Sequence, residues 1–223
     1  MITMNDPRWP KQLGDFGEQL VMYVIGRQKN MKVALVDHAG ADIIASDLNN
    51  KNNRYAISVK SHAVGVKISN GKVMMESKAY PFDGHNVDEL SKFADAFALR
   101  PAVSIVIVQP IVDQSCDDWN IRKRRAENAK TYFEPHEQLV IDVFTFSLED
   151  AQTIINEGKP YITANKRYGG FNFKFENRYF NELTHDKRID HVRLRFDPFS
   201  NIREWDQQHP MNTNAVQQTA DQE

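Results

Sequence analysis

The chain has 223 residues, of which 41% are hydrophobic and 26% charged, and its formal net charge at pH 7 is −2. This length and composition are typical of one globular domain with elaborations, or of two small domains at most. The near-neutral charge argues against histone-like binding of nucleic acid, and no apolar run approaches the roughly 18 residues of a membrane-spanning helix. A single cysteine, Cys116, excludes an intramolecular disulfide and favours a cytoplasmic setting.

The first half of the chain predicts two helices and four main strands. Apolar residues recur at helical spacing over residues 11–27, which predicts the first helix. Runs rich in β-branched residues predict strands, and the last of them is the continuous apolar kind that is buried on both faces. We expect these strands at residues 31–36, 41–46, 54–60 and 102–108.

Between the third and fourth of these strands, turn residues divide the chain further. Asn70-Gly71 predicts a tight hairpin turn, because that dipeptide tolerates positive φ angles. We expect a loop over residues 81–85 and a helix over residues 87–99, with Asn86 as its N-cap. The predicted order of the first half is therefore α-β-β-β-α-β.

The second half is expected to form an extension of mixed α and β structure. Ser147 with Asp150 resembles a capping box that opens a helix ending near residue 157. Around that helix we expect a strand at 139–146, a hairpin at 161–175 and a strand at 191–196. We divide the chain into a core at residues 1–110, a C-terminal extension packed on it at 111–206, and a disordered tail at 207–223.

Two of the predicted strands carry a charged residue where a core residue is expected. Asp42 opens the strand at 41–46, and Lys60 closes the strand at 54–60. An unpaired charge is costly to bury, so such residues are paired, metal-bound or catalytic. A hairpin would bring the carboxylate and the ammonium together at one end of a sheet, where they form either an ion pair or a site.

The order of these elements and three of their residues resemble the PD-(D/E)xK nuclease superfamily, which includes restriction endonucleases and Holliday-junction resolvases. The matching residues are Glu18 in the first helix, Asp42 in Gly40-Ala41-Asp42, and Lys60 in Ser58-Val59-Lys60. The resemblance covers residues 11–109. It implies a restriction-endonuclease-like α/β core, with a mixed central sheet flanked by helices, and endonuclease-like hydrolysis of DNA phosphodiester bonds.

The resemblance also implies a role for each residue. Asp42 would be the central ligand of Mg²⁺ or Mn²⁺, with the backbone carbonyl of Val59 as a second ligand and Glu18 reaching the metal from the helix. Lys60 would orient or activate the attacking water. Mg²⁺ suits this chemistry because it prefers oxygen ligands and stabilises the charge of the phosphate. A homodimer and a DNA partner are consistent with the resemblance.

The chain departs from the pattern at Ser58, where the superfamily usually has an acidic residue. One interpretation is that a missing carboxylate comes from Glu89 or Asp88, with Glu76 a poorer candidate, since Ser-Val-Lys variants with a displaced acid occur in the superfamily. The alternative is a catalytically inactive nuclease fold that acts as a nucleic-acid-binding or protein-interaction module.

Basic residues are clustered although the whole chain is near neutral. A locally positive surface can bind phosphates, but a solvated face beside core aromatics explains the same pattern. The candidate nucleic-acid-binding residues are Arg122, Lys123, Arg124, Arg125, Lys166, Arg167, Lys174 and Arg178.

Overall fold

The structure is a computed structural model, and it describes residues 8–50, 52–64, 66–69, 72–75, 78–110 and 139–196. Its helical elements are α1 (Trp9–Tyr23), continued by a π-helical turn η1 (Val24–Gln28), then α2 (Gly84–Ala96), α4 (Leu148–Asn156) and α5 (Asn177–His185). Its strands are β1 (Met31–His38), β2 (Ala41–Asp47), β3 (Arg54–Ala63), β4 (Val66–Ser69), β5 (Lys72–Met75), β6 (Lys78–Phe82), β7 (Arg100–Pro110), β8 (Leu139–Ser147), β9 (Ile162–Ala164), β10 (Phe171–Phe175) and β11 (Asp190–Phe196).

The central element is a six-stranded mixed sheet in the order β1-β2-β3-β7-β8-β11. β3 and β7 run parallel, with Lys60 opposite Ile105, and the other neighbouring pairs are antiparallel. A parallel pair needs a crossover connection, and α2 forms part of it here. The predicted α/β class and the order α-β-β-β-α-β are confirmed.

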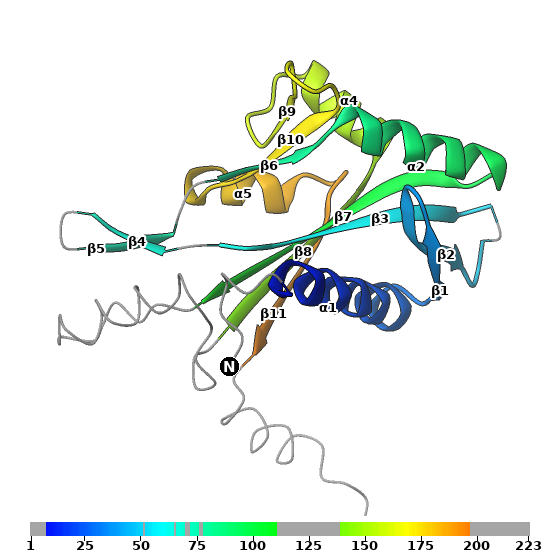
Figure 1. The fold of residues 1–223 in the computed structure, drawn as a ribbon, viewed down its shortest axis with the longest axis horizontal. Helices are drawn as coiled ribbons and strands as arrows, with labels where there is room; N and C mark the ends of the chain where they lie inside the picture. Colours follow the sequence, from blue (N-terminus) through cyan, green and yellow to red (C-terminus); the bar gives the residue numbers. More distant parts are fainter. Residues whose placement is uncertain are drawn as a thin grey trace, which may run out of the picture.

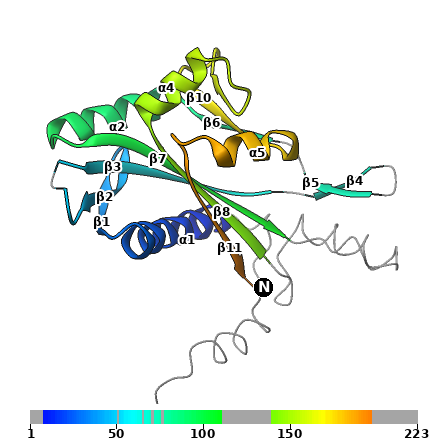
Figure 2. The same ribbon diagram turned by 180° about the vertical axis from the view of Figure 1, so that it is seen from behind.

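Helices cover both faces of this sheet (Figures 1 and 2). α1 lies on one face, where Val21 packs with Ile43, Val59 and Val106. α2, α5 and a small three-stranded sheet in the order β6-β10-β9 cover the other face. The buried side chains on that face include Leu90, Ile105, Phe144, Phe173 and Leu183.

The segment after residue 139 extends the first half of the chain rather than only lying against it. β8 and β11 add two strands to the large sheet, and β9 and β10 join β6 in the small one. The predicted hairpin at 161–175 and the strand at 191–196 are present, and Oγ of Ser147 accepts the N–H of Asp150 at 3.0 Å as the N-cap of α4. The division into residues 1–110, 111–206 and 207–223 stays a prediction.

The predictions around residues 81–86 are wrong in two respects. Pro81 and Phe82 belong to β6 and not to a loop, and α2 already begins at Gly84. The N-cap of α2 is Asp83, whose carboxylate accepts the N–H of Asn86 at 2.9 Å, so Asn86 is the capped residue and not the cap. Helix α5 was not predicted. No helix in the described ranges is long and apolar enough to cross a membrane.

Candidate active site

The start of β2 and the middle of β3 place Asp42 beside Ser58 and Val59. The antiparallel register pairs Ile43 with Ile57, so the preceding residue of β2 comes level with Ser58. Oδ2 of Asp42 accepts the backbone N–H of Val59 at 2.6 Å and the hydroxyl of Ser58 at 3.3 Å. Ser58 is buried and Asp42 is half-buried. These two donors fix the carboxylate at the edge of the hydrophobic core.

Glu18 approaches the same place from α1. The pKa of its half-buried carboxyl is raised, first by burial and then by the negative charge of Asp42. Gly17 allows the helix to come this close, because a Cβ at position 17 would collide with Oγ of Ser61 on β3. The Ser61 hydroxyl is buried there and has no hydrogen-bond partner among the described residues.

Lys60 is the third charged group of this cluster. Its positive charge, like that of Lys11, opposes the rise in the pKa of Glu18, which places Lys60 in the electrostatic neighbourhood of the two carboxylates. Nζ lies 5.8 Å from the ring centroid of Phe82 on β6, a favourable cation–π arrangement. No ion pair within the described ranges joins Lys60 to Asp42 or Glu18. The alternative of a simple ion pair that closes the sheet is therefore not what the structure shows.

Glu89, Asp88 and Glu76 are the acids proposed to replace the carboxylate that is missing at position 58. The Glu89 carboxylate accepts a hydrogen bond from Lys92 at 3.1 Å, which lowers its pKa, and the imidazoles of His85 and His38 are also near it. Asp88 is exposed on α2, and Glu76 lies outside the described residues. The backbone of Glu89 packs against Gly40, two residues before Asp42, so α2 itself lies close to the start of β2.

The candidate metal ligands are the carboxylate oxygens of Asp42 and Glu18 and the backbone carbonyl oxygen of Val59. No group of three or more His, Cys, Asp or Glu side chains in the described ranges is arranged to hold a metal ion. Two carboxylates, Asp42 and Glu18, nevertheless share one electrostatic neighbourhood, in which Asp15 adds to the negative charge and Lys11 and Lys60 offset part of it. Carboxylates are hard oxygen donors, and a divalent cation would relieve their mutual repulsion, so the residues present fit Mg²⁺ or Mn²⁺.

The candidate nucleic-acid-binding residues are spread over the second half of the chain. Lys166 and Arg167 are exposed on the turn between β9 and β10, and Lys174 is half-buried on β10. Arg178 is exposed on α5 but forms an ion pair with Glu176 at 2.6 Å. The segment Arg122 to Arg125 lies outside the described residues.

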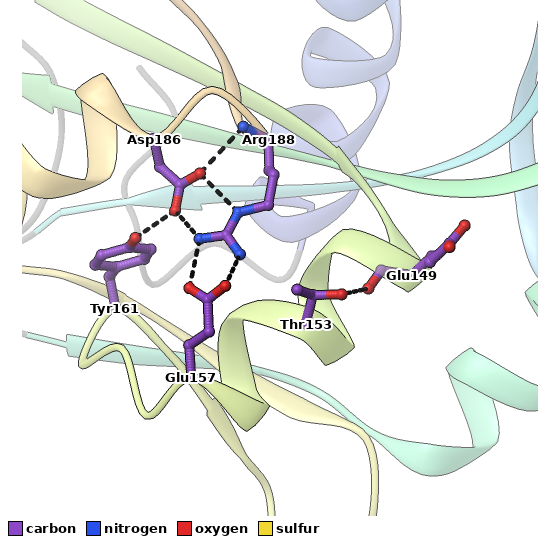
Figure 3. Close-up of polar contacts among 6 residues, drawn as sticks. All are labelled: Glu149, Thr153, Glu157, Tyr161, Asp186 and Arg188. Carbon is purple, nitrogen blue, oxygen red and sulfur yellow. Dashed lines mark hydrogen bonds and ion pairs between the residues drawn. The ribbon is translucent and has the colours of Figure 1, made fainter.

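Two clusters of paired carboxylates were not predicted from the sequence. Figure 3 shows the first, in which Asp186 and Glu157 both bind the guanidinium of Arg188 and the Tyr161 hydroxyl donates to Asp186. In the second, fully buried Asp142 accepts hydrogen bonds from Gln109 and Arg193, with Nε2 of His191 at 2.7 Å. The signal for the second was visible, since Asp142 is the lone charge in an otherwise apolar strand.

A cavity of about 530 Å³ lies at the opposite end of β3 from Lys60. Tyr55 and Ile57 from β3, Ala102 from β7 and Ser147 at the end of β8 are among its lining residues. It includes none of Glu18, Asp42 and Lys60, so it is separate from the candidate active site.

No protein-family model matches the sequence, and no curated protein matches it. Among solved structures, the Holliday junction resolvase Hjc of Archaeoglobus fulgidus, an archaeal hyperthermophile, is similar to this chain at 12% sequence identity and a TM-score of 0.38. The match covers 76% of this chain and 88% of that chain. The fold class therefore rests on the sheet order and helix placement described above.

Proposed function

We propose that this chain is a divalent-metal-dependent nuclease that hydrolyses phosphodiester bonds of DNA. The observation that carries the proposal is the convergence of Glu18, Asp42 and Lys60 from one helix and two neighbouring strands. Two carboxylates repel each other there, and an ammonium without an ion pair in the described ranges lies near them. Such an imbalance of charge is typical of sites that take up a cation or a phosphate.

In this proposal Asp42, Glu18 and the backbone carbonyl of Val59 would hold Mg²⁺ or Mn²⁺, which would neutralise charge at the phosphate and lower the pKa of water. The Val59 N–H and the Ser58 hydroxyl hold Asp42 in place. Lys60 would orient the attacking water and stabilise the hydroxide that forms when the water loses its proton to solvent. The hydroxide then attacks phosphorus, the bond to the leaving oxygen breaks, and that oxygen takes up a proton.

Glu89 or Asp88 remains the proposed source of a further carboxylate in place of Ser58. The Glu89 backbone lies against Gly40, but its carboxylate is held by Lys92. A role for Glu89 would therefore require that the ion pair with Lys92 opens. Loss of cleavage in Glu89→Gln, with full activity in Lys92→Ala, would support that role over a purely structural one.

The test of the proposed function is cleavage of plasmid DNA and of a branched oligonucleotide with Mg²⁺ or Mn²⁺. We expect Asp42→Ala to lose cleavage, and Lys60→Ala to slow it by about 10²- to 10⁴-fold, the usual contribution of an acid–base group. Asp95→Ala and Lys32→Ala are matched controls, because both residues are exposed on neighbouring elements. Cleavage that survives both site substitutions would refute the assignment.

A second candidate function is a catalytically inactive fold that binds nucleic acid or another protein. Ser58 favours it, because a hydroxyl is a weaker Mg²⁺ ligand than the carboxylate usual at that position. Such a module would show salt-dependent DNA affinity and no metal-dependent product. For either function we propose phosphate contacts from Arg122 to Arg125, Lys166, Arg167, Lys174 and Arg178. A cytoplasmic location and a homodimer are part of the same proposal.

A further inference from the structure

The turn between β9 and β10, residues 165–170, carries an aromatic ring that the core does not use. Tyr168 is 60% exposed, the largest exposed fraction among the large hydrophobic side chains of the described ranges. The Arg167 guanidinium lies 4.9 Å from the centroid of that ring, and Lys166 is exposed next to it. The turn thus combines two cations with one open aromatic face.

Hydrogen bonds hold this turn in one conformation. The side chain of Asn165, itself buried, accepts the backbone N–H groups of Arg167 at 3.2 Å and of Tyr168 at 3.3 Å. The Tyr168 carbonyl accepts the N–H of Gly84, the first residue of α2, at 3.0 Å. The ring is therefore presented from a backbone that is already ordered, which reduces the entropy lost on binding.

The turn also packs on β6, the strand whose Phe82 ring faces Lys60. Gly170 has a φ of 68°, and a Cβ at that position would collide with the carbonyl oxygen of Phe82. The ring of Phe82 in turn lies under Nζ of Lys60. The turn and the candidate active site therefore contact the same residue of β6, on the α2 side of the large sheet.

We propose that this turn binds an unpaired base of a DNA strand, with the Tyr168 ring as the stacking surface and Lys166 and Arg167 on the flanking phosphates. The inference rests on the proposed nucleic-acid substrate and narrows it to DNA with an unpaired segment, such as a single strand, a flap or an open branch. Duplex DNA hides the faces of its bases, whereas every unpaired base offers one to an aromatic ring. Cations beside the ring match the charge of the strand.

The test is the affinity of the full chain, in EDTA, for a fluorescent 20-nucleotide single strand and for its duplex, measured by anisotropy. We expect Tyr168→Ala to weaken single-strand binding by about 5- to 100-fold and duplex binding by less than twofold, and Tyr168→Phe to retain both. Tyr23→Ala is the matched control, because Tyr23 is 55% exposed on α1 and away from this turn. Thermal unfolding of each variant shows that the fold is intact.

Lys166→Ala and Arg167→Ala give a second readout. Each should weaken both substrates and reduce the slope of log affinity against log salt by about one. An equal loss for single strand and duplex in Tyr168→Ala, or no loss in either, would overturn the stacking site.

The proposed function and this inference fail in different ways. Metal-dependent cleavage by the unaltered chain, with no change of single-strand preference in Tyr168→Ala, defeats the inference alone. A Tyr168-dependent preference for single strands in a protein that never cleaves DNA defeats the nuclease assignment and supports the binding site.

Discussion

The negative charge of the carboxylates is compensated to different extents in two regions of this molecule, the cluster around Arg188 and the pair Asp42 and Glu18. Asp186 accepts hydrogen bonds from Nε of Arg188 at 2.9 Å and from the Tyr161 hydroxyl, and Glu157 accepts two more from the same guanidinium (Figure 3). Asp42 and Glu18 have a lysine nearby but no ion pair with it.

The pKa values of Asp186 and Glu18 are shifted in opposite directions, in agreement with this difference in charge compensation. Hydrogen bonds from Arg188 hold the pKa of Asp186 well below its usual range, whereas burial and the charge of Asp42 raise the pKa of Glu18. Carboxylates that stabilise a fold are neutralised by their neighbours in the chain. The proposed function predicts the opposite for Asp42 and Glu18, because the carboxylates of a cation site are left partly uncompensated until the cation binds.

The largest expected effect on stability comes from removing the positive charge of Arg188, which Asp186 and Glu157 share. We expect Arg188→Gln to lower the free energy of unfolding by about 1–3 kcal/mol at pH 7, because the largely buried carboxylate of Asp186 loses its charged partner. Urea denaturation measures this loss. Lys11→Gln is the control, since its ion pair with Asp15 is exposed and should be worth less than about 1 kcal/mol. Equal losses in the two variants would show that the cluster is not a stabilising one.

A smaller effect is expected from acid. The pKa of Asp186 is depressed in the folded chain, so its contribution to stability is fully present above the ordinary carboxyl pKa of about 4 and is lost as the pH falls toward the folded value. The chain should therefore lose stability between pH 5 and pH 2, and Asp186→Asn should lose less over the same interval. Urea midpoints at several pH values measure both. An identical acid loss in the two proteins would assign the acid sensitivity to other groups.

The sequence predicted the elements that carry strong periodicity and missed those whose partners lie far away in the chain. A loop is predicted over residues 81–85, yet Pro81 lies in β6, the edge strand of the small sheet next to β10, a position that tolerates proline. Asp83 caps α2 because its carboxylate accepts the N–H of Asn86, three residues further along the chain. Both Asp and Asn favour the N-cap position, so residue type alone does not distinguish Asp83 from Asn86. Helix α5 has few apolar residues, and it is stabilised by the burial of Leu183 and by contacts of Phe180 with Phe175.

The candidate site was predictable to a similar extent. Asp42 and Lys60 were visible because a charge in an apolar strand is unusual, and the element order identified Glu18. The Phe82 ring under Lys60 depends on packing between distant segments, which no sequence spacing reveals. The pairing of Glu89 with Lys92, by contrast, has the i,i+3 spacing of neighbours on a helix. The cluster around Arg188 in Figure 3 joins residues 157 and 161 to residues 186 and 188, a pairing of distant segments that sequence spacing does not reveal.

The smallest expected change in stability concerns Asp42 and Glu18, whose carboxylates repel each other. Without metal, Asp42→Asn should change the free energy of unfolding by less than about 1 kcal/mol, because relief of the repulsion with Glu18 offsets weaker hydrogen bonds to Val59 and Ser58. With Mg²⁺ at ten times its dissociation constant, the unaltered chain should gain about 1.4 kcal/mol and the variant almost nothing. Thermal unfolding with and without Mg²⁺ measures both, with Asp95→Asn as the control that keeps the gain. An equal Mg²⁺ gain in Asp42→Asn would place the cation elsewhere, and the charge imbalance at Glu18 and Asp42 would then need another explanation.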